Sequence, residues 1–185
     1  MALENSELSE ETRKSVLDWC FSVLKAKLEK KKVPEGPALE GNGTVFVTLK
    51  RNGKLRGCIG NFSWDRPLKD MIRDMTVSAA FGDPRFPPLS LPELEGLEIT
   101  ISVLSPLEPL NDLNDLVIGR DGLYIIHPGG RGVLLPVVAE EQGWDAREFA
   151  EHTSIKAGLN PQAYKDKNAR LMVFTAPAFS SADYE

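Results

Sequence analysis

Alternating apolar residues ahead of an Asn-Gly pair narrow the fold of this chain more than any other feature. The apolar residues take every second position of the first run, at Val45, Val47 and Leu49. Such alternation is typical of a strand with one buried face. Asn52-Gly53 then supplies the two positive-φ positions of a type I′ turn, and a return strand begins near Leu55. The sequence therefore predicts an antiparallel β-hairpin.

The return strand carries an unusual segment, Leu-Arg-Gly-Cys-Ile-Gly, from Leu55 to Gly60. Two glycines weaken a strand and usually mark a bulge or a close approach of another backbone. A basic residue near a cysteine favours the reactive thiolate, and small neighbours let a ligand approach the backbone. We therefore take Cys58 as the candidate catalytic residue, with its neighbours as candidate ligand-binding residues: Arg56, Gly57, Ile59 and Gly60.

A structural role for Cys58 is the alternative, and the pattern alone favours it. A nucleophilic cysteine normally needs a base, which is usually a histidine. Only His127 and His152 are present, and both lie far from Cys58 in the sequence. Cys20 lies within a helical apolar stripe, so we interpret it as a small buried hydrophobic residue.

The remaining elements come in mixed order. Helices are predicted from a cap at Ser9 to about residue 28, over 67–81 with Asp65 as the N-cap, and over 145–157. Further strands are predicted over 97–103, 123–126, 133–138 and 170–175. The strand over 133–138 is almost continuously apolar, which is typical of a central strand covered on both faces. This order favours an α+β fold with an antiparallel or mixed sheet packed with helices.

Three polar residues outside the return strand are further candidates for ligand binding. Asp83 and Arg85 flank Pro84, where they can bind a polar ligand or simply pin the loop. Lys156 lies at the end of a predicted helix, where it can bind a ligand or stabilise the helix dipole. The glycine-rich segment 129–132 lacks the Gly-Lys-Ser/Thr ending of a phosphate loop, so we interpret it as a hairpin tip.

Charge and cysteine content exclude several classes of function. The net charge of −5 does not fit a protein that binds the backbone of duplex nucleic acid. Two cysteines and two histidines, widely scattered, show no zinc-ligand spacing, so no metal site is expected and no cofactor is identified. The polar start of the chain and the lack of a long apolar run indicate a cytoplasmic protein without a membrane span.

Several short motifs, in order along the chain, resemble the AMMECR domain family. The specific one is Arg-Gly-Cys-Ile-Gly at 56–60, and the others are 46–49, 80–89, 101–105, 118–123, 134–139, 143–145 and 156–159. The chain is most similar to the prokaryotic branch, called AmmeMemoRadiSam system protein A. The resemblance implies one domain over 1–185, with a folded core of about 9–179 and poorly ordered termini. It also implies a smaller lobe and a cleft, with Memo-type and radical SAM proteins as partners.

One departure from the family pattern bears on mechanism. Many prokaryotic relatives carry a cysteine just before the Lys-Ala-Gly-Leu string, and this chain has Ser154 there. A mechanism that uses two cysteines is therefore disfavoured. The chain also lacks the three-cysteine set that an iron–sulfur cluster of radical SAM chemistry needs.

Three functions follow from these observations. The first is an enzyme or enzyme component that binds a small ligand in a cleft around the 55–60 segment, with Arg56 and Arg85 holding an anionic group. The second is a non-catalytic protein-interaction module. The third, a nucleic-acid-linked regulator, fits the acidic charge least. We also predict that Cys58, Asp83, Arg85 and Lys156 converge in space.

Overall fold

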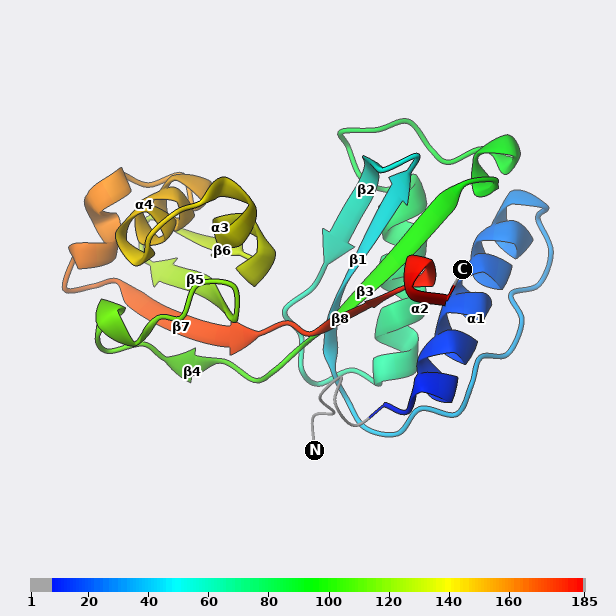
Figure 1. Cartoon of the computed structure of the whole chain (residues 1–185), viewed down its shortest axis with the longest axis horizontal. Helices are drawn as coiled ribbons and strands as arrows, with labels where there is room; N and C mark the ends of the chain where they lie inside the picture. Colours follow the sequence, from blue (N-terminus) through cyan, green and yellow to red (C-terminus); the bar gives the residue numbers. More distant parts are fainter. Residues whose placement is uncertain (1–7, 185) are drawn as a thin grey trace. The chain divides into compact units, whose positions relative to one another are not determined.

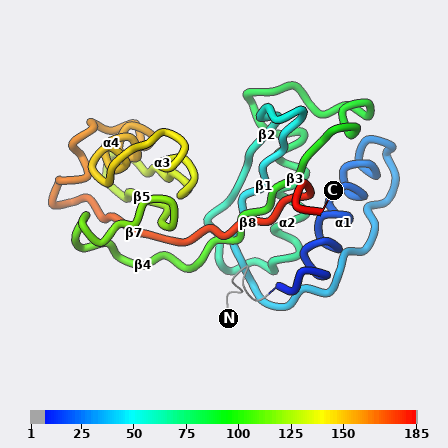
Figure 2. The backbone as a smooth tube through the Cα atoms, viewed as in Figure 1, coloured from blue at the N-terminus to red at the C-terminus, as the bar shows by residue number. Residues whose placement is uncertain are grey.

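The computed structural model describes residues 8–184, which form two compact units. The first unit runs up to Leu104 and is completed by the segment from Pro177, and the second is Ser105–Ala176. Figure 2 traces the chain out of the first unit and back into it. Each unit combines helices with an antiparallel sheet, which confirms the α+β class. The interpretation of residues 1–185 as one domain stays a prediction, and its N-terminal residues 1–7 lie outside the described part.

The first unit is a four-stranded sheet covered by two helices (Figure 1). Its strand order is β2-β1-β3-β8, with β1 at Thr44–Arg51, β2 at Lys54–Gly60, β3 at Leu97–Leu104 and β8 at Ala178–Ser180. Helix α2, Leu68–Phe81, packs along β1 and β2, and α1, Glu10–Leu28, packs against α2. The core lies between this sheet face and the helices, and Val47, Leu49 and Ile101 are fully buried there.

The predicted hairpin is confirmed. Asn52 and Gly53 have φ values of 52° and 72°, as a type I′ turn requires. The pairing of β1 with β2 shifts register where Lys50 pairs with Leu55 and Leu49 with Gly57. Arg56 is therefore the extra residue of a β-bulge, next to the glycine that signalled one.

Gly57 is where the strand and the helix backbone meet. A Cβ atom at Gly57 would lie 2.0 Å from the carbonyl oxygen of Ala79 in α2. No side chain fits at that distance, so glycine is required for β2 to pack against α2. This is the close backbone approach that the two glycines predicted.

The helix predictions hold, with one correction at a cap. Ser9 caps α1 by accepting a hydrogen bond from the backbone N–H of Thr12, as expected. Asp65 does not cap α2, because the helix begins after Pro67, which has no capping side chain. Asp65 instead accepts a hydrogen bond from the Ser63 hydroxyl, so a local turn satisfies it. Cys20 is fully buried in α1, as predicted.

The second unit has the strand order β4-β7-β5-β6. These strands are β4 at Glu108–Pro109, β5 at Asp121–His127, β6 at Gly130–Leu134 and β7 at Arg170–Thr175. Helix α3 is Pro136–Gln142, and α4 is Ala146–Lys156, which matches the predicted helix over 145–157 and begins with a capping box of Asp145 and Glu148. Leu123, Ala139 and Phe149 form the buried centre of this unit's core.

Two further predictions are wrong. The apolar run over 133–138 is not one central strand, because β6 ends at Leu134 and lies at the sheet edge, and Pro136 begins α3. Proline suits the first helical turn, and an apolar run alone does not separate strand from helix. The C-terminal end, for which poor order was predicted, is structured, because Phe179 in β8 pairs with Ile101 and is buried in the core, and Ser181–Tyr184 forms a 3-10 helix.

Within residues 8–184, no helix is long and apolar enough to cross a membrane.

Gly57→Ala tests the close packing of β2 on α2. The new methyl group would meet the backbone of Ala79, which cannot rotate away, so we expect the free energy of unfolding to fall by about 3 kcal/mol. Gly53→Ala is the control. A Cβ at Gly53 would meet no other atom, so only the strain of its positive φ should lower the free energy of unfolding, by about 1–2 kcal/mol. Urea denaturation measures both losses, and a smaller loss at Gly57 than at Gly53 would contradict the close approach.

Candidate functional site

Arg56 is turned into the protein rather than toward a ligand. Its side chain is 10% exposed, and Nε and Nη2 donate to the two carboxylate oxygens of Glu93 at 2.7 and 3.2 Å. Nη2 also donates to the Pro87 carbonyl oxygen at 2.9 Å, whereas Nη1 is buried without a partner. The bulge thus gives Arg56 a structural task, tying β2 to the 87–93 segment. Its part in holding an anionic group stays a prediction.

Glu93 is the carboxylate that balances this buried cation. The hydrogen bond from Arg56 lowers the pKa of Glu93 to about 2 against the opposing effect of burial, and bonds from Ser90 add to the shift. Sequence reasoning missed Glu93. Its capping-box spacing after Ser90 was the available signal, although that spacing says nothing of Arg56.

Asp83 and Arg85 clamp the backbone of Cys58. One carboxylate oxygen of Asp83 accepts from the Cys58 backbone N–H at 2.9 Å and from Arg85 Nη2 at 2.7 Å. The other accepts from the Arg85 backbone N–H and Nε, and Arg85 Nη2 also lies 3.3 Å from the Cys58 carbonyl oxygen. Because β2 is the edge strand, this loop supplies partners that a neighbouring strand would otherwise provide.

The surroundings of Asp83 stabilise the charged form of its carboxylate. Asp83 is 4% exposed, and Arg85 holds the pKa of its carboxyl well below its usual range, against burial and with help from the Cys58 N–H. Arg85 itself keeps 54% of its side chain exposed, so it can also face a ligand. Of the four residues expected to converge, these two and Cys58 are brought together.

Cys58 points to the sheet face that the helices leave open. Its neighbour Gly57 faces α2, and side chains alternate along a strand. The Cys58 thiol is half-buried and lies 3.2 Å from the Thr48 hydroxyl, its cross-strand partner. Cys58 is thus partly exposed on a sheet face whose backbone is fixed.

A row of hydroxyl groups continues from Cys58 across the whole sheet. Thr48 pairs with both Cys58 and Thr100, and Thr100 pairs with Ser180 of β8. The Thr100 hydroxyl lies 3.1 Å from the Ser180 hydroxyl. Sequence reasoning missed this row, because the partners come from strands far apart in the chain and the strand of Ser180 was not expected.

Aromatic side chains border this polar row on one side. Gly60 lies beneath the ring of Phe46, where a Cβ would come within 2.3 Å of the ring. Phe62 meets Phe46 edge-on at 5.5 Å, and Trp64 follows at 5.7 Å from Phe62. Gly60 therefore allows an aromatic surface beside Cys58. Ile59 faces the core instead, so its side chain is a packing residue.

The other candidate residues belong to the second unit. Lys156 is exposed in the last turn of α4, and Ser154 is buried and donates to the Ala150 carbonyl oxygen. His127 lies 3.6 Å from Asp166, and His152 stacks on Trp144 with the ring centroids 3.8 Å apart. A part for Lys156 in the Cys58 site stays a prediction.

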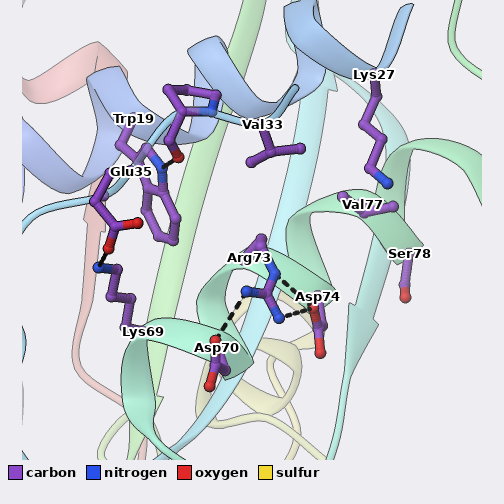
Figure 3. Close-up of a pocket in the computed structure, with 12 residues that line it drawn as sticks. Trp19, Lys27, Val33, Glu35, Lys69, Asp70, Arg73, Asp74, Val77 and Ser78 are labelled. Atoms are coloured by element: carbon purple, nitrogen blue, oxygen red, sulfur yellow. Dashed lines mark hydrogen bonds and ion pairs between the residues drawn. The ribbon is translucent and has the colours of Figure 1, made fainter. Parts of the chain in front are cut away.

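Two surface hollows of the first unit are lined by residues other than Cys58. One of about 840 Å³ opens between α1, α2 and the 33–36 loop (Figure 3). There Arg73 binds Asp70 and Asp74, and Lys69 binds Glu35, so most of its charges neutralise each other. A hollow of about 290 Å³ reaches the start of the motif at Leu55 and Arg56. Among residues 8–184, no group of three His, Cys, Asp or Glu side chains could hold a metal ion.

Glu93→Gln tests the Arg56 anchor through its pH dependence. In the wild type the unfolded carboxyl titrates at about 4.5 and the folded one at about 2. The stabilisation is therefore complete above pH 4.5 and is lost as the pH falls toward 2. We expect Glu93→Gln to lose about 1–3 kcal/mol at pH 7 and to flatten the stability curve over that window.

Urea denaturation at pH 7, 4.5 and 3 measures this difference. Glu95→Gln is the control, because Glu95 is exposed and, within residues 8–184, hydrogen-bonds only through its backbone carbonyl, which accepts from Arg51 Nε. A Glu93→Gln curve parallel to that of the wild type between pH 4.5 and 3 would contradict the anchor.

Comparison with known proteins confirms the resemblance. A profile of the AMMECR1 family matches residues 17–179. A protein of Methanothermobacter thermautotrophicus is 46% identical over 141 residues, covering 73% of each chain, and one of Methanopyrus kandleri is 37% identical over 84% of this chain and 81% of its own. The crystal structure of an uncharacterised protein from Pyrococcus horikoshii is similar with a TM-score of 0.87 and 33% identity, covering 94% of this chain and 93% of that one. The chain therefore belongs to the AMMECR1 family.

Proposed function

We propose that this protein is an enzyme or enzyme component that binds a small ligand on the open sheet face of its first unit, in contact with the Cys58 thiol. One observation carries the proposal. Cys58 is partly exposed with its thiol beside Thr48, and the Asp83–Arg85 loop holds both its backbone N–H and its carbonyl oxygen. A side chain held on a rigid strand and supported by a second layer of hydrogen bonds is what a precise binding site requires.

The chemistry of this face fits a small polar ligand with an apolar part. Thr48, Thr100 and Ser180 each offer a hydroxyl that can donate and accept. The rings of Phe46 and Phe62 border the row and provide apolar surface. Arg85 adds an exposed cation at the strand edge, which suits an anionic group on the ligand.

A non-catalytic interaction module is the second candidate, and the surroundings of Cys58 favour it. Among the described residues, the side chain that hydrogen-bonds the thiol is Thr48, and neither histidine belongs to this unit. A hydroxyl is a poor general base, so the thiol has no base of this unit to activate it. In this second case the open face would dock a protein.

Partner proteins fit both candidates. The family resemblance points to Memo-type and radical SAM proteins, and we propose them as partners of this chain. The two cysteines here provide no ligand set for an iron–sulfur cluster, so radical chemistry would have to come from such a partner. A nucleic-acid-linked role has the least support, because the chain is acidic.

Alkylation of Cys58 with iodoacetamide tests the proposal, with Cys20 as the internal control. Burial raises the pKa of the Cys20 thiol to about 12, although a hydrogen bond from Thr76 opposes this, so Cys20 reacts only after unfolding. We expect Cys58 to be labelled quickly in the native protein, as read by peptide mass spectrometry. The small-molecule fraction of a Methanothermobacter thermautotrophicus lysate should slow this labelling severalfold.

The variant Thr100→Val distinguishes a ligand bound on this face from other causes of slower Cys58 labelling. It removes one hydroxyl of the row and keeps the shape, so the protection should weaken while the labelling rate without the fraction stays unchanged. Cys58 labelled as slowly as Cys20 would contradict an accessible thiol. Equal labelling with and without the fraction, but slower labelling with a purified Memo-type protein, would favour the interaction module.

A further inference from the structure

Two arginines of the second unit face the same way across its sheet. Ile126 of β5 pairs with Arg131 of β6 on one side and with Arg170 of β7 on the other. Neighbouring strands lie about 4.8 Å apart, so the two arginine Cα atoms are about 10 Å apart with Ile126 between them. The strands β6, β5 and β7 are neighbours in this sheet (Figure 1). The three side chains therefore form one row across them.

This row lies on the face opposite to the core and to α4. Ile125, the neighbour of Ile126, is fully buried, so Ile126 points the other way. Gly132, the neighbour of Arg131, faces α4, because a Cβ there would lie 2.5 Å from the Ala157 backbone nitrogen. The glycines around Arg131 are thus explained by helix packing, and the arginine is left on the open side.

Both guanidinium groups are available to a ligand. Across residues 8–184, neither Arg131 nor Arg170 makes a side-chain hydrogen bond or an ion pair, and both are exposed. The other two arginines of this unit behave differently, since Arg120 binds Asp121 and Arg147 lies near Glu151. The two free guanidinium groups repel each other electrostatically. An anion bound between them would offset this repulsion, so the row favours anion binding.

A surface hollow of about 490 Å³ lies at this row. Arg131, Arg170 and Ile126 line it together with His127, Asn168 and the 128–130 turn. Two residues that line the hollow contact the carboxylate of Asp166. This carboxylate accepts hydrogen bonds from the backbone and side-chain nitrogens of Asn168 and lies 3.6 Å from His127 Nε2. The hollow thus combines two free cations, an apolar floor and neutral polar groups.

We propose that this hollow is a binding site for a small molecule with two linked phosphate groups. A guanidinium matches a phosphate with two parallel hydrogen bonds. Arg131 and Arg170 stand on either side of Ile126, so each can hold one phosphate of a diphosphate, with the bridging part over the isoleucine. The site lies in the second unit and does not depend on Cys58.

Isothermal titration calorimetry with sodium pyrophosphate tests the site in the full chain. We expect saturable binding that weakens as salt is raised from 50 to 300 mM. Arg131→Gln or Arg170→Gln should each raise the Kd about tenfold or more, and the double variant should show no binding. Arg131→Lys should fall in between, because it keeps the charge and loses the planar fork. Arg147→Gln is the matched control and should bind as the wild type does.

Three results would overturn the proposal. The first is no saturable heat with the wild type, or binding that the two arginine variants leave unchanged. The second is orthophosphate binding as tightly as pyrophosphate, since that would remove the need for two arginines. The third is arginine-dependent binding of a thymidine decanucleotide that carries no terminal phosphate, together with no binding of pyrophosphate. That result would assign the row to single-stranded nucleic acid. Circular dichroism of each variant shows that it is folded.

Discussion

The hydrogen bonds from the Asp83–Arg85 loop to the backbone of Cys58 are the interaction on which the candidate site depends. β2 is an edge strand, and its outward N–H and C=O groups would otherwise face water or another chain. Asp83 accepts from the Cys58 N–H, and Arg85 donates to its carbonyl oxygen. The loop closes the edge with side chains, so the strand stays in place while its thiol remains on the open face.

The order Arg-Gly-Cys in the motif has a physical reason at each position. Arg56 is the extra residue of the bulge and reaches inward to Glu93. Gly57 lets the helix α2 approach the strand, because no side chain fits below Ala79. Cys58 then points to the opposite face. The three consecutive residues therefore serve as an anchor, as a packing point and as a half-buried thiol on the open face.

The sequence predicted local structure well, and it predicted contacts between distant segments of the chain poorly. The Asn52-Gly53 turn and the Ser9 cap were readable, because each depends on a few neighbouring residues. The Glu93 anchor and the row to Ser180 were not, because they join segments that only the folded sheet brings together. The change from β6, which ends at Leu134, to α3, which begins at Pro136, was missed, since an apolar run fits a strand and a buried helix equally well. Asp83 and Arg85 were singled out, but their contacts with the Cys58 backbone were not predicted, and their part in ligand binding stays a prediction.

Amide hydrogen exchange at Cys58 tests the central claim most directly. In the wild type the Cys58 N–H donates to a buried carboxylate, so its exchange should be slow for an edge strand. Asp83→Ala should speed exchange at Cys58 by about tenfold or more, since a hydrogen bond to a charged group is worth about 1.5–3 kcal/mol. The amide of Ile101 in the central strand β3 should change far less. Equal exchange at Cys58 in both proteins, or equal acceleration at Ile101, would contradict the clamp.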